Sequence, residues 1–415
     1  MMRGLDVSLV LMVQWSGLLI LAAGAVKLAY LPLAAAFEWR ASGRVQAGLY
    51  DGALVSVVVP GYNEEVVLEA CVLSILRSTH RRLEVILVDD GSSDGTLALM
   101  GALAARDERI TVLTQANAGK GAALNAGIRA AHGEFFLFVD ADGLFAPDTV
   151  AWMLAGFGSP EVGAVCGDDR PVNLDRVQTR MLAVLSHTGT GMVRRALSLV
   201  RCLPIVSGNV GAYRAGLVRR LGGFREDTVG EDLELTWRVY EAGYRVRFQP
   251  RALVYAESPS TLAGLWKQRV RWSRGLLQTV RRHPGMLGSL RYGPIGVFLL
   301  FNLFAMVVVP LLQLAVIILL GLLASGGIVL LPTGILGFLG WAGLLFSVAV
   351  TVYSIGLNRA WRDLRHLWTA PLWPLYSLFM ALVMVTAVVK ELSGAPARWN
   401  KLQRTGVRSV GEAGT

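Results

Sequence analysis

Cysteine and histidine are both scarce in this sequence, with three Cys and five His among 415 residues. Cys71, Cys166 and Cys202 lie far apart and form no CxxC pair, which excludes a zinc site or a disulfide framework as the basis of the fold. The scattered histidines predict no imidazole metal centre. This cysteine usage is typical of proteins in a reducing cytosol.

Charge is also scarce. Charged residues make up 17% of the chain and hydrophobic residues 53%, with a mean hydropathy of +0.50. A soluble protein of this size would carry more charge. The apolar excess is concentrated before about residue 37 and after about residue 293. This pattern indicates membrane segments on either side of a soluble middle part.

The N-terminal segment, residues 1–37, is predicted to be a transmembrane anchor. Between Val7 and Ala36 the only charged residue is Lys27, and a helix of this length exceeds the ~30 Å of a bilayer core. The run is longer than a signal-peptide core and lacks a convincing cleavage site. Arg40 and Arg44 follow it, so the positive-inside rule predicts a multi-pass protein of the cell membrane with a cytoplasmic middle part.

Further apolar segments lie in the C-terminal part. Residues 294–356 are predicted to form two transmembrane helices, at about 295–323 and 328–355. Residues 357–392 are either a third crossing or an interface segment, and the basic residues on both flanks of 371–389 favour the interface. Residues 393–415 then form a cytosolic tail.

The formal net charge is +10. Positive-inside bias and affinity for anionic membrane lipid account for it, and an anionic substrate such as a nucleotide sugar would add to it. The sequence contains no nucleic-acid recognition motif, so no nucleic-acid partner is predicted.

The middle part alternates strands and helices. Apolar, β-branched runs at 54–59, 83–88, 110–113 and 135–139 each end in a polar or Gly-rich loop, and helical patterns follow them. This alternation predicts an α/β fold with a doubly wound parallel sheet. The expected catalytic domain covers residues 53–260.

Two carboxylates end the most apolar of these strands. Asp140 and Asp142 follow the run Phe135–Val139, at the strand end where open α/β sheets bind ligands. Buried carboxylates need a partner, and hard oxygen ligands beside a phosphate predict Mg²⁺ or Mn²⁺. A role of the two carboxylates as turn or helix caps is the alternative.

Three further features belong to the same interpretation, and each has a structural alternative. Lys120 lies in a Gly-rich lead into a helix, where it could meet a diphosphate or be a solvated turn lysine. Glu231 and Asp232 begin a helix, which they could simply cap. Residues 261–293 contain an amphipathic, basic, Trp-rich helix typical of a membrane interface, in which Trp272 could be only an anchor.

Five motifs in this order resemble glycosyltransferase family 2, in particular the processive membrane branch of cellulose, hyaluronan and poly-N-acetylglucosamine synthases. They are PGYNE at 60–64, DDGSSDGT at 89–96, DAD at 140–142, ED at 231–232 and QRVRW at 268–272. Each motif is weak by itself, but five in the right order are specific. The resemblance implies a GT-A type, nucleotide-sugar-binding cytosolic domain inserted between transmembrane helices.

The resemblance also implies a role for individual residues. Asp232 would be the general base, and Asp140 and Asp142 would bind the metal. The residues implied in binding the UDP part of the donor are Pro60, Tyr62, Glu64, Asp89, Asp90, Lys120 and Asp140. Those implied at the acceptor or the diphosphate are Glu231, Gln268, Arg271 and Trp272. The segment 399–406 resembles the gating loop of these synthases, although its length and spacing differ.

The sequence therefore predicts an inverting, metal-dependent membrane glycosyltransferase. It would polymerise a UDP-sugar, UDP-GlcNAc or UDP-glucose, onto a growing β-linked polysaccharide and extrude the polymer. The sequence leaves open whether an accessory subunit takes part. The alternatives are a non-processive transferase that makes a glycolipid and an inactive scaffold subunit. A transporter is disfavoured because no paired repeats are present.

Overall fold

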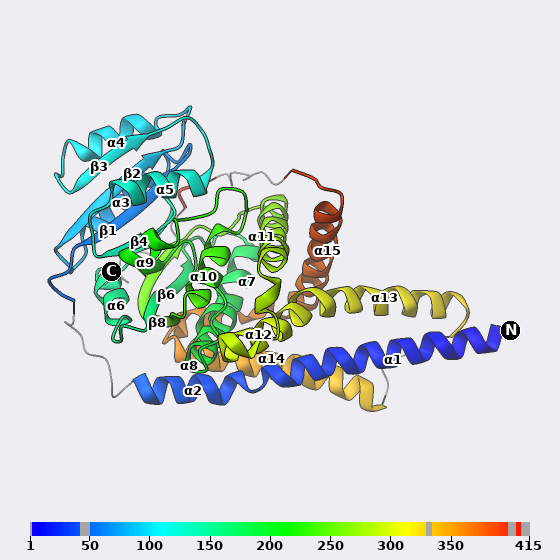
Figure 1. Cartoon of the computed structure of the whole chain (residues 1–415). Coiled ribbons are helices and arrows are strands. Elements are labelled where there is room, and N and C mark those ends of the chain that lie inside the picture. The colour runs from blue at the N-terminus through cyan, green and yellow to red at the C-terminus, as the bar shows by residue number, and fades with distance from the viewer. Residues whose placement is uncertain (1, 42–49, 329–333, 397–403, 408–415) are drawn as a thin grey trace.

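The structure, a computed structural model, describes residues 2–41, 50–328, 334–396 and 404–407. Its centre is one eight-stranded mixed sheet with the strand order β3-β2-β1-β4-β7-β6-β8-β5 (Figure 1). The strands are β1 Val55–Gly61, β2 Leu83–Asp89, β3 Ile110–Thr114, β4 Phe135–Phe138, β5 Leu144–Phe145, β6 Val162–Pro171, β7 Gly211–Arg214 and β8 Arg245–Ala256.

The first half of the sheet is parallel, as the alternating pattern predicts. β1 pairs in parallel with β2 and β4, and β2 with β3. The second half is mixed, because β7 runs antiparallel to both β4 and β6, whereas β6 and β8 are parallel. The edge strand β5 runs antiparallel to β8.

Helices cover both faces of this sheet. The helices of the catalytic part are α3 Leu68–Leu76, α4 Thr96–Ala104, α5 Lys120–Ala130, α6 Thr149–Ala155, α7 Val177–Ser186, α8 Val193–Leu199, α9 Ala215–Arg220 and α10 Glu231–Glu241. A π-helical turn, η1 His187–Met192, joins α7 to α8. The parallel strands are thus buried on both sides, which is why they consist of continuous apolar runs.

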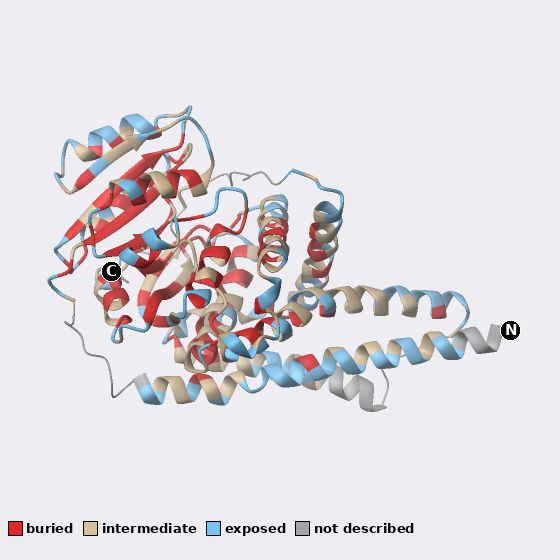
Figure 2. Cartoon of the chain, in the orientation of Figure 1, coloured by how far each residue is buried: buried red, intermediate tan, exposed pale blue. Residues whose placement is uncertain are grey.

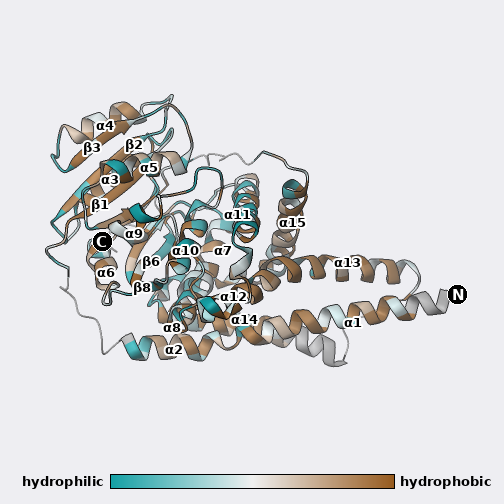
Figure 3. Ribbon diagram, viewed as in Figure 1, coloured by the Kyte–Doolittle hydropathy of each residue, from teal (hydrophilic) through white to brown (hydrophobic). Residues whose placement is uncertain are grey.

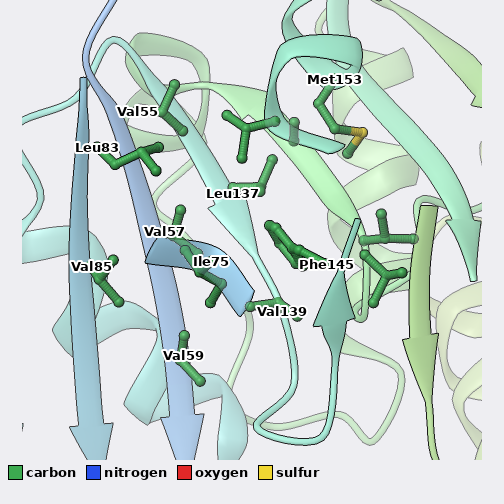
Figure 4. Close-up of a cluster of buried hydrophobic side chains, with 14 of the residues drawn as sticks. Val55, Val57, Val59, Ile75, Leu83, Val85, Leu137, Val139, Phe145 and Met153 are labelled. Atoms are coloured by element: carbon green, nitrogen blue, oxygen red, sulfur yellow. The ribbon is translucent and has the colours of Figure 1, made fainter. Parts of the chain in front are cut away.

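Alternate residues of each strand enter different cores. Val57 of β1 and Leu137 of β4 pack with α3, α4 and α6, and Figure 4 shows Ile75 and Met153 against this face. The neighbouring residues Val58 and Phe138 point to the opposite face, which packs with α5, α8, α9 and α10. The period of two is that of a pleated strand.

The remaining helices extend from this domain. They are α1 Met2–Lys27, α2 Tyr30–Ala41, α11 Leu262–Arg282, α12 Pro294–Leu303, α13 Val309–Ser325, α14 Gly334–Leu357 and α15 Trp373–Leu392, with the short turns η2 Pro284–Met286, η3 Leu290–Tyr292, η4 Phe304–Val308 and η5 Trp361–Leu372. In Figure 1, α1 and α13 run side by side away from the sheet.

Three of these segments are long and apolar enough to cross a membrane, among the residues that the structure describes. They are Val7–Arg40, Pro294–Ser325 and Trp361–Leu392. The described part of α14 is a shorter apolar helix, Ala342–Leu357. Figures 2 and 3 show that α1 is hydrophobic yet largely exposed, and that α13 is hydrophobic yet mostly only partly buried, as lipid-facing helices are. The segment 371–389, for which the sequence favours an interface position, falls within the third of these segments.

Candidate active site

The carboxyl ends of β1, β2 and β4 meet at one edge of the sheet. Gly61 of β1 pairs with Asp89 of β2, and Val58 of β1 pairs with Phe138, two residues before Asp140. A cavity of about 510 Å³ opens there. The residues predicted from the sequence that line it are Pro60, Tyr62, Glu64, Asp90, Lys120, Asp140 and Glu231.

The two neighbouring aspartates at the end of β2 differ in position. The Asp90 carboxylate lies on the cavity wall, where it accepts hydrogen bonds from the Ala118 N–H and the Gly119 N–H, both at 2.9 Å. Asp89 is 1% exposed and does not line the cavity. Its oxygens accept from the Ser92 N–H and the Thr114 hydroxyl. Asp89 therefore fixes the loop that places Asp90.

Lys120 is held between carboxylates at the start of α5. Gly119 precedes it with φ of 93°, a left-handed conformation that favours glycine. The Lys120 ammonium forms an ion pair with Asp140 and lies 3.6 Å from Glu231. Burial by itself would lower the pKa of Lys120, but the neighbouring carboxylates, Asp140 foremost, raise it. The Lys120 ammonium therefore stays protonated at every physiological pH.

Asp142 lies deeper than Asp140 and is 4% exposed. Its Oδ2 accepts from the Glu257 N–H at 2.9 Å and lies 2.8 Å from a guanidinium nitrogen of Arg404. Its Oδ1 is buried and has no hydrogen-bond partner among the residues that the structure describes. Burial raises the pKa of the Asp142 carboxyl, although Arg404 opposes that rise.

Asp140 and Asp142 fit a divalent cation. A buried carboxylate oxygen without a partner is costly and would gain from a ligand, and hard carboxylate oxygens suit Mg²⁺ or Mn²⁺. Among the described residues, no group of three or more His, Cys, Asp or Glu side chains is placed to hold a metal. The pair therefore suits a cation that completes its coordination with phosphate oxygens and water.

The C-terminal segment 404–407 lies against this pair of aspartates. Arg404 lines the cavity and also lies 3.7 Å from Glu64. Glu257, directly after β8, accepts hydrogen bonds from the Thr405 N–H at 3.0 Å and the Gly406 N–H at 2.6 Å. Of the predicted gating loop at 399–406, residues 399–403 lie outside the described residues.

Asp232 lies in the first turn of α10, on the other side of Lys120. Its Oδ2 accepts from the Gly208 N–H at 3.0 Å and its Oδ1 from the Leu233 N–H at 2.8 Å. Burial, together with the negative charge of Glu231, raises the pKa of Asp232 to about 6, against the opposing charge of Lys120. A carboxylate with a pKa near the working pH is suited to accept a proton.

Helix α11 carries the QRVRW motif and packs beside α10. Arg271 donates a hydrogen bond of 3.4 Å to the Val229 carbonyl, just before Asp232. The Trp272 ring is 48% exposed and lies 4.2 Å from the Arg269 guanidinium. Within the described part of the chain, the buried Oε1 of Gln268 has no hydrogen-bond partner. The motif is thus brought to the α10 side of the site rather than to the wall formed by the ends of β1 and β2.

One known protein family matches the part of the chain that contains this site. The family described as "Glycosyltransferase like family 2" matches residues 52–275, more than half of the chain. The chain belongs to glycosyltransferase family 2. The family predicted from the five motifs, and with it the enzyme class, is confirmed.

Two relatives place the chain within this family. It is 31% identical over 222 residues to the poly-beta-1,6-N-acetyl-D-glucosamine synthase of Staphylococcus aureus (strain COL), and 30% identical over 222 residues to the synthase of the same name from Staphylococcus epidermidis. Each comparison covers 53% of this chain and 54% of the relative. The chain thus spans about half the length of the curated relatives it matches, and it is related to a polysaccharide synthase.

A solved structure shows the same fold over most of the chain. The mannosyltransferase PcManGT from Pyrobaculum calidifontis, in complex with GDP-Man and Mn²⁺, superimposes with a TM-score of 0.61 at 24% identity. The match covers 91% of this chain and 100% of that one. The predicted α/β glycosyltransferase fold between candidate membrane helices is confirmed.

The sequence did not single out several residues at the site. Glu257 follows β8, a strand that the sequence did not predict. Arg404 contacts Asp142 although the two residues lie far apart in the sequence, so no local sequence pattern could indicate the contact. Gly208 donates to Asp232, and a Cβ there would lie 3.1 Å from the Lys120 ammonium. The one sequence signal for Gly208 is that it lies in a run of mostly small and polar residues, 207–214.

The glycine before Glu231 also has a structural reason. A Cβ on Gly230 would lie 2.8 Å from the Gly275 Cα of α11. Gly230 and Gly275 allow α10, which carries Asp232, to approach α11, which carries QRVRW, at backbone contact.

Proposed function

We propose that this chain is an inverting glycosyltransferase that uses a UDP-sugar to extend a β-linked polysaccharide. The observation that carries the proposal is that Asp90, Lys120, Asp140 and Asp232 lie together at the edge of the sheet where the parallel strands end. The relationship to poly-beta-1,6-N-acetyl-D-glucosamine synthases supports UDP-GlcNAc as the donor, with UDP-glucose as the second choice.

The donor would lie in the 510 Å³ cavity. Pro60, Tyr62 and Glu64 would surround the base, and Asp90 would contact the uridine. Asp89 would act through the loop that it fixes. This assignment uses the wall formed by the ends of β1 and β2, where open α/β sheets bind nucleotides.

The diphosphate would lie near Lys120 and Arg271. Both side chains are cationic and would stabilise the negative charge that develops on the departing UDP. Asp140 and Asp142 would hold Mg²⁺ or Mn²⁺, which when bound supplies further positive charge to the diphosphate. The Mn²⁺ in the PcManGT complex agrees with this choice of metal. Arg404 would have to move away from Asp142 before both carboxylate oxygens of Asp142 could bind the cation.

Asp232 would act as the general base. The acceptor hydroxyl oxygen forms a bond to the anomeric carbon while the bond from that carbon to the diphosphate oxygen breaks, and the hydroxyl proton passes to Asp232. The displacement inverts the anomeric centre, so an α-linked donor gives a β-linkage. The Gly208 and Leu233 N–H groups orient the carboxylate for this transfer.

The acceptor end of the growing polymer would lie between Glu231, Gln268 and Trp272. A buried polar atom without a partner on Gln268 would gain from a sugar hydroxyl. The exposed Trp272 ring offers an apolar face for stacking on a sugar.

The chain would be a multi-pass protein of the cell membrane with its catalytic part in the cytoplasm. We assign residues 53–260 to catalysis, 261–293 to interface helices, 294–356 to two transmembrane helices and 393–415 to a cytosolic tail with a gating segment. Residues 357–392 would be an interface segment that does not complete a crossing, because Arg404 of the tail contacts Asp142 of the catalytic part and the two must lie on one side of the membrane. The polymer would leave through these segments.

A product assay tests the proposal. The full chain in membranes is incubated with a panel of radiolabelled UDP-sugars and Mg²⁺ or Mn²⁺, and the products are separated by size. A long polymer that a β-specific glycosidase degrades is the expected result. A single labelled sugar on lipid would instead support the non-processive alternative, and no transfer from any UDP-sugar would refute both.

A further inference from the structure

A second cavity, of about 540 Å³, lies outside the active site. Its walls come from the segment that leads into α7 and from η5, and they share no residue with the cavity of the candidate active site. The lining residues are Leu174, Asp175, Arg180, Arg365, His366 and Trp368.

Two arginines and one carboxylate line this cavity, so its formal charge is positive. Arg180 uses its Nε to donate to the Leu174 carbonyl at 2.7 Å, and Arg365 uses its Nε to donate to His366 Nε2 at 3.1 Å. The terminal nitrogens of both guanidinium groups have no ion-pair partner among the described residues. The nearest acidic lining residue, Asp175, is instead paired with Arg176 at 3.4 Å. Two free guanidinium forks from different elements are suited to a phosphate group.

The cavity lies at the start of a candidate membrane segment. η5 opens the apolar stretch Trp361–Leu392 and follows α14 directly. Two tryptophans of η5 are exposed, Trp361 at 59% and Trp368 at 52%. Exposed Trp beside Arg at the end of an apolar helix is typical of the headgroup level of a bilayer. This position favours a lipid phosphate over a phosphate free in solution.

A buried polar network lies next to this cavity and joins η5 to the catalytic domain. His187, directly after α7, contacts Asp363 of η5 at 2.8 Å through Nε2 and the Asn358 side-chain amide at 2.9 Å through Nδ1. Arg195 of α8 donates to the same amide group at 2.7 Å. η5 is therefore fastened to the catalytic domain beside the cavity, which keeps both walls of the cavity in place.

We propose that this cavity binds the phosphate headgroup of an anionic membrane lipid, with Arg180 and Arg365 as the phosphate ligands and Trp368 at the rim. A lipid bound there bridges the catalytic domain and the apolar segment Trp361–Leu392. The proposal concerns a site separate from the active site and does not depend on which sugar is transferred.

The test uses the full chain in nanodiscs of phosphatidylcholine with a minor fraction of phosphatidylglycerol. Native mass spectrometry then measures the phosphatidylglycerol that stays bound to the protein. We expect Arg180→Gln and Arg365→Gln each to weaken retention by about fivefold, from the worth of one basic residue near an anionic surface. The matched control is Arg362→Gln, because Arg362 is exposed on the same helix and does not line the cavity.

Two results would overturn the proposal. An equal loss of lipid in R362Q would mean that only general surface charge attracts the lipid. Displacement of the lipid by millimolar glycerol 1-phosphate would mean that the site binds soluble phosphate compounds. R180K keeps the charge and checks that R180Q has not merely unfolded α7, and it should retain more lipid than R180Q.

Discussion

Lowering the pH should remove transfer through the protonation of Asp232. Its pKa is about 6 in this structure, and only the ionised carboxylate can accept the acceptor proton. With that pKa, roughly 90% of the base is ionised at about pH 7 and roughly 10% at about pH 5, so kcat/KM should fall roughly tenfold between them. Initial rates of UDP release across this range, at saturating metal, measure the acid limb.

Glu231 provides the control on the cause of this limb. Because its negative charge helps to raise the pKa of Asp232, Glu231→Gln should move the limb to lower pH, whatever it does to the maximal rate. Glu241→Gln, at the far end of α10 beside His283, should leave the limb in place. A limb that stays unchanged in E231Q would refute the electrostatic reasoning. A limb that persists in the residual activity of D232N would refute the assignment of the base.

Four other substitutions test the rest of the site. Asp142→Asn should abolish divalent-dependent transfer while membrane insertion and the circular dichroism spectrum stay unchanged, and persistence of metal-dependent transfer would contradict the metal assignment. Lys120→Gln should lower kcat/KM by roughly ten- to a hundredfold, the worth of about 1.5–3 kcal/mol for a hydrogen bond to a charged group; an unchanged value would exclude a contact with the diphosphate. Gly208→Ala should lower kcat more than it weakens UDP binding, since its methyl group would enter between the base and the lysine; equal effects on both would argue against this position. Gly230→Ala should destabilise the fold by about 1–3 kcal/mol through overpacking on α11, seen as a lower Tm, whereas Gly216→Ala, which meets open space, should not lower the Tm.

The parallel half of the sheet could be predicted because each of its strands has a recognisable pattern within its own few residues. Buried parallel strands require continuous apolar runs, and Phe135–Phe138 is such a run with every residue at most 2% exposed. The carboxylates after it report the ligand-binding edge directly. The order of the motifs then predicted which elements would meet, since parallel strands place all their carboxyl ends at one edge.

The antiparallel half could not be predicted in the same way. β7, Gly211–Arg214, is only four residues long and lies in a run of mostly small and polar residues. β8 contains Pro250 and several arginines, and its pairing with β6 shifts register after Cys166. Neither strand shows the run or the alternation on which a strand prediction depends.

The residues of the site could be predicted, but the contacts between segments that are distant in the sequence could not. The sequence nominated both Asp140 and Asp142, but not that Arg404 would lie on one of them. It nominated Asp89 and Asp90 together, whereas only Asp90 lines the cavity. Such distinctions depend on how loops pack in three dimensions. The close approach of Gly230 to Gly275 is of the same kind.

The central claim is that Asp232 accepts the acceptor proton next to a UDP-sugar held by the strand ends. Asp232→Asn in the full chain tests it most directly, with UDP binding measured by calorimetry and sugar transfer measured on the same preparation. The account predicts that UDP binds as tightly as to the unchanged chain while transfer falls by two orders of magnitude or more, on the order of the 10²–10⁴-fold contribution of a general base. Unimpaired transfer by a variant that binds UDP normally would contradict it.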